Sequence, residues 1–169
     1  MKRLNILLPV LCLLVLLCAC GKAGSADAPA GDAFRFSTTD LDSNAVESEA
    51  LFKGARVTVV NLWATWCGPC VRELPELEKL REDYADKGVQ VVGILLETSA
   101  SAVKDAKTIL SGAGADYTVL LPTEEMGKLI DVQYIPTTYF VDSKGSVLGD
   151  AAVGADVQGY RDRLDKLLK

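Results

Sequence analysis

The feature of this sequence that most constrains its fold is a pair of cysteines, Cys67 and Cys70, at the point where a buried strand gives way to a helix. Residues 57–63 form an apolar run rich in β-branched residues, which predicts a central strand. Leucines recur at helical spacing after the pair, and Pro69 stands where the first turn of a helix tolerates proline. The pair is therefore expected at a helix N-terminus, whose dipole favours the thiolate of Cys67.

This placement suits thiol–disulfide exchange. Cys67 is expected to be the nucleophile, and Cys70, one turn later on the same helix face, to attack the mixed disulfide and release the partner. Gly68 and Pro69 keep the turn between them tight. Three other interpretations compete: a structural disulfide, whose small loop gains little stability; a zinc half-site, which needs two further ligands; and a motif that is kept without activity.

The N-terminal segment is set apart by its composition. Residues 1–19 combine Lys2 and Arg3 with an apolar run shorter than the ~20 residues of a spanning helix, which predicts a secretory signal peptide. A transmembrane anchor is the alternative. Residues 20–31 are small or polar and predict a flexible tether, and residues 32–169 predict one domain.

The end of the apolar run, Leu17-Cys18-Ala19-Cys20, resembles the bacterial lipobox. The resemblance implies that Cys20 is the lipidated first residue of the mature chain. Plain secretion with cleavage near Ala19, or the use of Cys18, are the alternatives. If Cys20 carries the lipid, Cys67 and Cys70 are the remaining free thiols, in an exported protein whose compartment lets disulfides persist.

The amino-acid composition excludes or disfavours several classes of function. The chain has no histidine, which excludes Ser-His-Asp and Cys-His catalysis and histidine-ligated metals. With 18 basic and 23 acidic residues the formal charge is −5, so nucleic acid is an unfavourable partner. The sequence contains neither Gly-x-Gly-x-x-Gly nor a P-loop, and we expect no metal and no organic cofactor beyond the redox-active cysteine pair.

The remaining pattern predicts a mixed α/β domain, because short apolar runs alternate with helical periodicity. In chain order we expect an opening β-hairpin over 34–47, a strand at 57–63, a helix over 67–87, a strand at 89–96, a helix at 101–110, an extended piece at 117–121, a weak helix at 123–131, a hairpin of 137–141 with 146–148, and a closing helix at 155–168.

The run Asn61-Leu62-Trp63-Ala64-Thr65-Trp66-Cys67-Gly68-Pro69-Cys70, together with Pro75 and Ile135-Pro136-Thr137-Thr138, resembles the thioredoxin superfamily. Within it, the chain looks like the membrane-tethered thiol-disulfide oxidoreductases of the TlpA/ResA type, over about residues 34–169. The resemblance implies an α/β, thioredoxin-like three-layer sandwich, in which a central mixed sheet is flanked by helices and preceded by an N-terminal β-hairpin.

The resemblance also implies a substrate-binding surface. Pro136 would be a cis-proline facing the cysteine pair, and it would turn the Ile135 backbone toward the site, where it can pair with an extended substrate strand. Trp66 would flank that surface, beside Gly68 and Pro69. An ordinary trans Pro136 and a merely buried Trp66 are the alternatives.

A departure from cytoplasmic thioredoxins concerns proton transfer. Those proteins have a buried aspartate where this chain has Asn61, and an amide cannot relay a proton. TlpA/ResA-like proteins often carry an acid near the cysteine pair, and Glu97 follows the second strand. We therefore expect Glu97 to modulate the pKa of Cys70 and accept its proton; a solvated Glu97 is the alternative.

The resemblance implies an extracytoplasmic, membrane-anchored lipoprotein. Cys-Gly-Pro-Cys resembles the thioredoxin sequence associated with a low potential, which favours reduction of disulfides in exported proteins. Electrons would come from a CcdA/DsbD-type membrane donor and pass to apocytochrome c, as in cytochrome c biogenesis, to a methionine sulfoxide reductase or to other clients. The alternatives are a non-catalytic partner-binding or chaperone lipoprotein, and a peroxiredoxin-like peroxidase, whose Thr-x-x-Cys setting does not match Thr65-Trp66-Cys67.

Overall fold

The computed structural model describes residues 33–130 and 132–169. The predicted signal peptide (1–19), the tether (20–31) and the lipidation site Cys20 lie outside the described residues and stay predictions. Among the helices of the described part, none combines the length and the apolar character that crossing a membrane requires.

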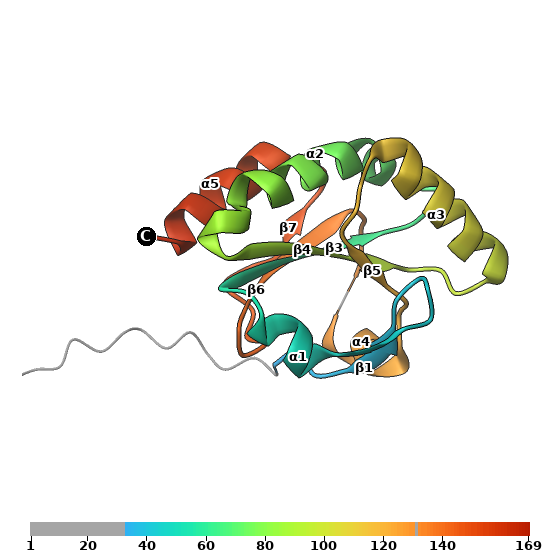
Figure 1. The fold of residues 1–169 in the computed structure, drawn as a ribbon, viewed down its shortest axis with the longest axis horizontal. Coiled ribbons are helices and arrows are strands. Elements are labelled where there is room, and N and C mark those ends of the chain that lie inside the picture. The colour runs from blue at the N-terminus through green and yellow to red at the C-terminus, as the bar shows by residue number, and fades with distance from the viewer. Residues whose placement is uncertain (1–32, 131) are drawn as a thin grey trace, which may run out of the picture.

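A mixed sheet of five strands runs through the centre of the domain (Figure 1). Its strands are β3 (Val57–Trp63), β4 (Val89–Leu95), β5 (Thr118–Leu120), β6 (Thr137–Asp142) and β7 (Ala152–Val153). They lie in the order β5-β4-β3-β6-β7. The first three run parallel, whereas β6 is antiparallel to β3, and β7 to β6. The central strand β3 is buried at every residue, as its continuous apolar run predicts.

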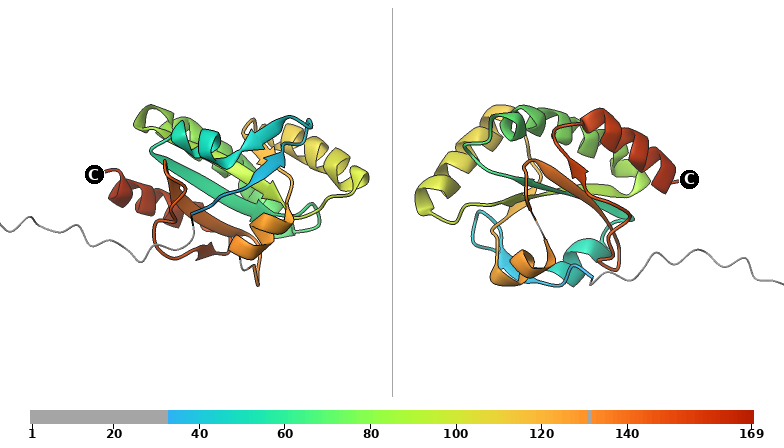
Figure 2. Two further views of the ribbon diagram at one scale, coloured as in Figure 1. Left: turned by 90° about the horizontal axis from the view of Figure 1, so that it is seen from below. Right: turned by 180° about the vertical axis from the view of Figure 1, so that it is seen from behind.

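Helices cover both faces of this sheet. One face carries α2 (Gly68–Tyr84), α3 (Ala100–Ala113) and α5 (Val157–Leu167), and the other carries α1 (Ser48–Lys53), α4 (Glu124–Leu129) and the two-stranded sheet of β1 (Ser37–Thr39) and β2 (Ala45–Glu47), as Figures 1 and 2 show. A 3-10 turn, Ala85–Lys87, follows α2. The predicted thioredoxin-like three-layer sandwich with an N-terminal hairpin is confirmed.

The alternation of side chains along β3 divides the core in two. Val59 and Trp63 pack with α2 on one face, while Val60 and Leu62 pack with residues of α1 and α4 on the other. The α2 face also holds both cysteines. The functional residues therefore belong to the core between α2 and the sheet.

The predicted hairpin of residues 137–141 with 146–148 forms, although its second arm is too short to count as a strand. Pairing there is limited to a bridge between Val141 and Val147 and a few backbone hydrogen bonds. The chain then leaves at Gly149, whose φ of 76° is in the left-handed region, and the strand that pairs with β6 is β7. The helix α1, between β2 and β3, was not predicted.

Gly93 of β4 faces the α2 side of the sheet and leaves room for an indole ring. A Cβ there would lie 3.0 Å from Val119 Cγ2 and 3.2 Å from Trp63 Nε1. We predict that Gly93→Ala lowers the free energy of unfolding by about 1–3 kcal/mol through overpacking, measured by urea denaturation. Gly112→Ala in α3 is the control, because its Cβ meets nothing within 4 Å and should not destabilise. Equal losses in both variants would contradict the packing argument.

Candidate active site

The cysteine pair lies at the start of α2, as predicted. Cys67 is the N-cap residue of the helix, and its Sγ accepts a hydrogen bond from the Cys70 backbone N–H at 3.3 Å. The sulfur thus takes the role of a capping group for an N–H that the first turn leaves unpaired. Cys67 and Cys70 form a disulfide. A thiolate on Cys67 would be stabilised by the same N–H and by the helix dipole.

The two sulfur-bearing residues differ in access. Cys67 is 5% exposed, whereas Cys70 is fully buried at 0%. Pro69 occupies the first turn between them. Cys67 is therefore the more accessible of the two residues, and the roles of nucleophile and resolving cysteine stay predictions.

The loop before β6 faces the disulfide. The Ile135–Pro136 peptide bond is cis, and the carbonyl oxygen of Ile135 lies 3.8 Å from Cys67 Sγ. Pro136 in turn accepts a hydrogen bond from the Gly154 N–H at 2.8 Å, next to β7. The backbone of Ile135 is thus held beside the accessible sulfur.

Large apolar side chains remain exposed around this sulfur. Trp66, which precedes Cys67, is 73% exposed, and Tyr134, which precedes Ile135, is 72% exposed. Val153, also exposed, pairs with Thr137 at the start of β6. A buried Trp66, the alternative interpretation, is not what the structure shows. Tyr134 and Val153 were not predicted, although a tyrosine directly before Ile-Pro could have been considered for the same surface.

Glu97 follows β4, and its carboxylate binds the loop before the cysteines. It accepts hydrogen bonds from the Thr65 backbone N–H at 2.6 Å and from the Thr65 hydroxyl at 2.8 and 2.9 Å. The side chain is half-buried. These contacts tie the end of β4 to the segment that leads into Cys67, and a role of Glu97 toward Cys70 stays a prediction.

A second carboxyl group lies deeper and was missed by the sequence reasoning. Glu73 is buried in α2, one turn after Cys70. Asn61 Nδ2 donates to Glu73 Oε1 at 2.8 Å, and the Tyr160 hydroxyl lies 3.4 Å from Oε2. Burial raises the pKa of Glu73 to about 7, although the hydrogen bonds from Asn61 and Tyr160 act in the opposite direction.

The helical period could have identified this residue. Positions 70, 73, 77, 80 and 84 fall on one face of a helix, and apart from Glu73 they carry cysteine, leucine and tyrosine. All five are buried. A glutamate on an otherwise apolar face, three residues after the second cysteine, is the signal that the sequence contained.

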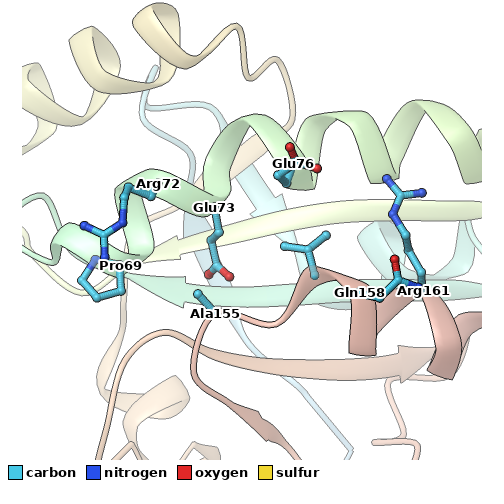
Figure 3. A pocket seen from close by; sticks show the side chains of 8 residues that line it. Pro69, Arg72, Glu73, Glu76, Ala155, Gln158 and Arg161 are labelled. Atoms are coloured by element: carbon cyan, nitrogen blue, oxygen red, sulfur yellow. The ribbon is translucent and has the colours of Figure 1, made fainter.

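A groove opens between α2 and the start of α5, and the Glu73 side chain points into it from α2 (Figure 3). Its volume is about 510 Å³. Arg72 lies at the rim of the groove, and its guanidinium is close to Gly68. A Cβ added to Gly68 would lie 3.3 Å from Arg72 Nη1. The residues that line it are Pro69, Arg72, Glu73, Glu76, Ala155, Val157, Gln158 and Arg161.

Thiol–disulfide exchange needs one reachable sulfur, a second sulfur shielded beside it, and a surface on which a polypeptide can lie. The described residues supply all three, which makes the chain a thiol-disulfide oxidoreductase on a thioredoxin-like fold. The sequence model of the Redoxin family matches residues 22–168, and the chain belongs to this family.

Individual relatives agree with this classification. The thiol-disulfide oxidoreductase ResA of Bacillus subtilis is 31% identical over 145 residues, which cover 80% of this chain and 78% of ResA. The thioredoxin-like protein YneN of the same organism is 35% identical over 102 residues, 60% of this chain and 58% of YneN. The chain thus aligns with less than two thirds of YneN.

Among solved structures, a thiol:disulfide interchange protein of the thioredoxin family from Chlorobium tepidum superimposes with a TM-score of 0.70 and 29% identity. The match covers 85% of this chain and all of that one. The family, the fold and the site therefore point to the same chemistry.

The burial of Glu73 makes stability depend on pH. Between its ordinary value of 4.5 and about 7, the folded protein keeps a proton that the unfolded chain has lost, so stability falls as pH rises. We predict that Glu73→Gln loses this decline and gains roughly 2 kcal/mol relative to wild type between pH 4 and pH 8. Urea denaturation of the oxidised protein across that range measures it.

The matched control is Glu76→Gln, an exposed glutamate of the same helix, which leaves Glu73 in place and should keep the decline. A wild-type profile that is flat from pH 4 to pH 8 would refute the assignment.

Proposed function

We propose that this chain is an extracytoplasmic, membrane-anchored oxidoreductase that reduces disulfides in exported proteins. The observation that carries the proposal is the disulfide with its reachable Cys67, its shielded Cys70 and the Ile135 carbonyl 3.8 Å from the outer sulfur. The names of its relatives, thiol-disulfide oxidoreductase and thiol:disulfide interchange protein, support the reaction. The lipobox-like leader supports the anchor at Cys20.

The first step forms a mixed disulfide. The Cys67 thiolate attacks one sulfur of the client's disulfide, the client's S–S bond breaks, and its other sulfur leaves as a thiolate that takes a proton from water. The N–H of Cys70 and the N-terminus of α2 would stabilise the negative charge of the attacking thiolate. Cys67 is then joined to the client.

The second step releases the client. Cys70 gives its proton to a carboxylate, and its thiolate attacks Cys67 Sγ, so that the Cys67–Cys70 disulfide forms while the client sulfur leaves as a thiolate. The client has gained two electrons. A dithiol donor of the CcdA/DsbD type would restore the reduced pair by the reverse sequence, and no cofactor is needed because electrons pass through the two sulfurs.

Glu73 suits the role of proton acceptor better than Glu97. It is buried on the same helix face as Cys70, one turn further on, and its pKa of about 7 lets it accept and lose a proton near neutral pH. The Glu97 carboxylate instead accepts hydrogen bonds from the backbone N–H and the hydroxyl of Thr65. We therefore assign the acceptor role to Glu73.

A client strand would lie along Ile135 and Pro136, pairing with the Ile135 backbone, with its side chains against Trp66, Tyr134 and Val153. This surface supports an unfolded or extended segment as substrate, because backbone pairing is indifferent to sequence. Oxidised exported proteins, including apocytochrome c or a methionine sulfoxide reductase, are the proposed clients.

The function is tested by trapping. Cys70→Ser should accumulate a mixed disulfide between Cys67 and a client or a model disulfide protein, because the resolving thiol is gone. Non-reducing electrophoresis of the full-length protein detects the adduct. Cys67→Ser is the control and should form no adduct and lose at least ~100-fold in disulfide reduction. A binding or chaperone protein would keep its function in Cys67→Ser, which would refute the proposal.

The direction is tested by the reduction potential of the Cys67–Cys70 pair, measured by equilibration in glutathione or dithiothreitol buffers. We expect a value near that of thioredoxin, about −270 mV, because the central pair is Gly-Pro. A value near −120 mV would identify an oxidant of newly exported thiols instead.

A further inference from the structure

Polar side chains from four elements meet in the core between α2, α5 and the sheet. Asn61 comes from β3, Glu73 from α2, Thr138 from β6 and Tyr160 from α5, and none of them is more than 4% exposed. Buried polar groups cost free energy unless they are hydrogen-bonded. The contacts among these four residues therefore determine whether the charged and the neutral form of Glu73 both find hydrogen-bond partners in the core.

Asn61 presents only donors to this cluster. Its Nδ2 donates to Glu73 Oε1 at 2.8 Å and to Thr138 Oγ1 at 3.0 Å, which uses both amide hydrogens. Asn61 and Thr138 are also register partners across β3 and β6. The amide is thus held in one orientation, and Oε1 receives an N–H whether Glu73 is charged or neutral.

Tyr160 presents a group that can donate or accept. Its hydroxyl donates to the Gly154 carbonyl at 2.8 Å and lies 3.4 Å from Glu73 Oε2. When Oε2 carries a proton, it can donate to the Tyr160 oxygen, which keeps its bond to Gly154. When Glu73 is charged, the Tyr160 hydrogen can turn to Oε2.

We propose that Asn61, Thr138 and Tyr160 are positioning residues for Glu73, and that the proton received from Cys70 is held on Oε2, opposite Tyr160. Oε1 is occupied by the Asn61 N–H and is a poor place for a proton. This inference rests on the proposed function and names the groups through which the acceptor works. The hydroxyl of Tyr160 can accept from the protonated form of Oε2 and donate to the charged form, so Oε2 faces a polar partner in both states.

The same cluster is connected to the proposed substrate loop. Gly154, whose carbonyl accepts from Tyr160, donates its N–H to Pro136 at 2.8 Å. Thr138 stands two residues after Pro136 on β6. The backbone that would bind a client therefore also sets the position of the Tyr160 hydroxyl relative to Glu73.

An amide at position 61 avoids a second buried carboxylate. An aspartate there would place two carboxyl oxygens about 2.8 Å apart, and the pair would share one proton and titrate in two steps. The other ionisable groups near Glu73 are Tyr117, from the segment before β5, and the groove residues Arg72, Glu76 and Arg161. Glu78, the other buried glutamate of α2, is paired with Arg81.

The test is the titration of the Glu73 carboxyl carbon in ¹³C-labelled full-length protein, followed by NMR, together with the pH profile of mixed-disulfide resolution. Tyr160→Phe removes the donor to the charged form, so both midpoints should rise by about half to one pH unit. Asn61→Asp should give two titration steps, with the upper midpoint more than about one unit above that of wild type.

Tyr84→Phe is the matched control. Its hydroxyl bonds to Asp165 at the same α2–α5 interface, away from Glu73, and its loss should leave both midpoints unchanged. Melting curves establish whether each variant folds. If Tyr160→Phe does not fold, Asn61→Asp, which keeps the shape of the side chain, tests the proposal by itself.

Unchanged midpoints in folded Tyr160→Phe or Asn61→Asp would overturn the positioning roles, even if the wild type reduces disulfides. A wild type that reduces no disulfide, with the Glu73 titration shifted as expected in the variants, would refute the proposed function and leave the cluster standing.

Discussion

The packing of α2 on the central sheet, against β4 and the residues of β3 that face the same core, is the constraint on which the rest of this structure depends. It places the helix N-terminus, with its unpaired N–H groups, at the end of the sheet where Cys67 follows β3. The same packing buries Cys70 completely and leaves Cys67 slightly exposed, at 5%. A longer loop between β3 and α2 would fix less firmly both the position of the helix N-terminus and the difference in exposure between the two cysteines. The asymmetry between the two sulfurs is therefore a property of the layer architecture and not of the Cys-x-x-Cys motif alone.

That packing also takes a carboxyl group into the core. A buried glutamate is costly when charged, and the raised pKa of Glu73 expresses this cost. Asn61 and Tyr160 compensate part of it by hydrogen bonding. The proposed proton acceptor is thus a buried carboxyl group whose pKa lies near neutral pH, three residues after Cys70 on the same helix.

Local patterns were sufficient for most of the fold. The β-branched run of β3, the spacing of leucines in α2 and the family motifs around Cys67 led to the observed sandwich. The strand β7 was not predicted, because it has two residues and pairs with β6 only after the chain has turned at Gly149. Glu97 was predicted as the acid near Cys70 because it follows a strand. Glu73 was missed, although it stands on the otherwise apolar face of α2.

The sequence by itself determined the cysteine chemistry, because a strand, a tight turn and a helix N-terminus involve neighbouring residues and local dihedral preferences. Only the tertiary structure decided that Glu73 is a buried carboxyl group with a raised pKa. The partners of Glu73 stand 12 residues away, at Asn61, and 87 residues away, at Tyr160. Burial and hydrogen bonding over such separations arise when strands and helices pack, and a pKa that depends on them is a property of the folded domain.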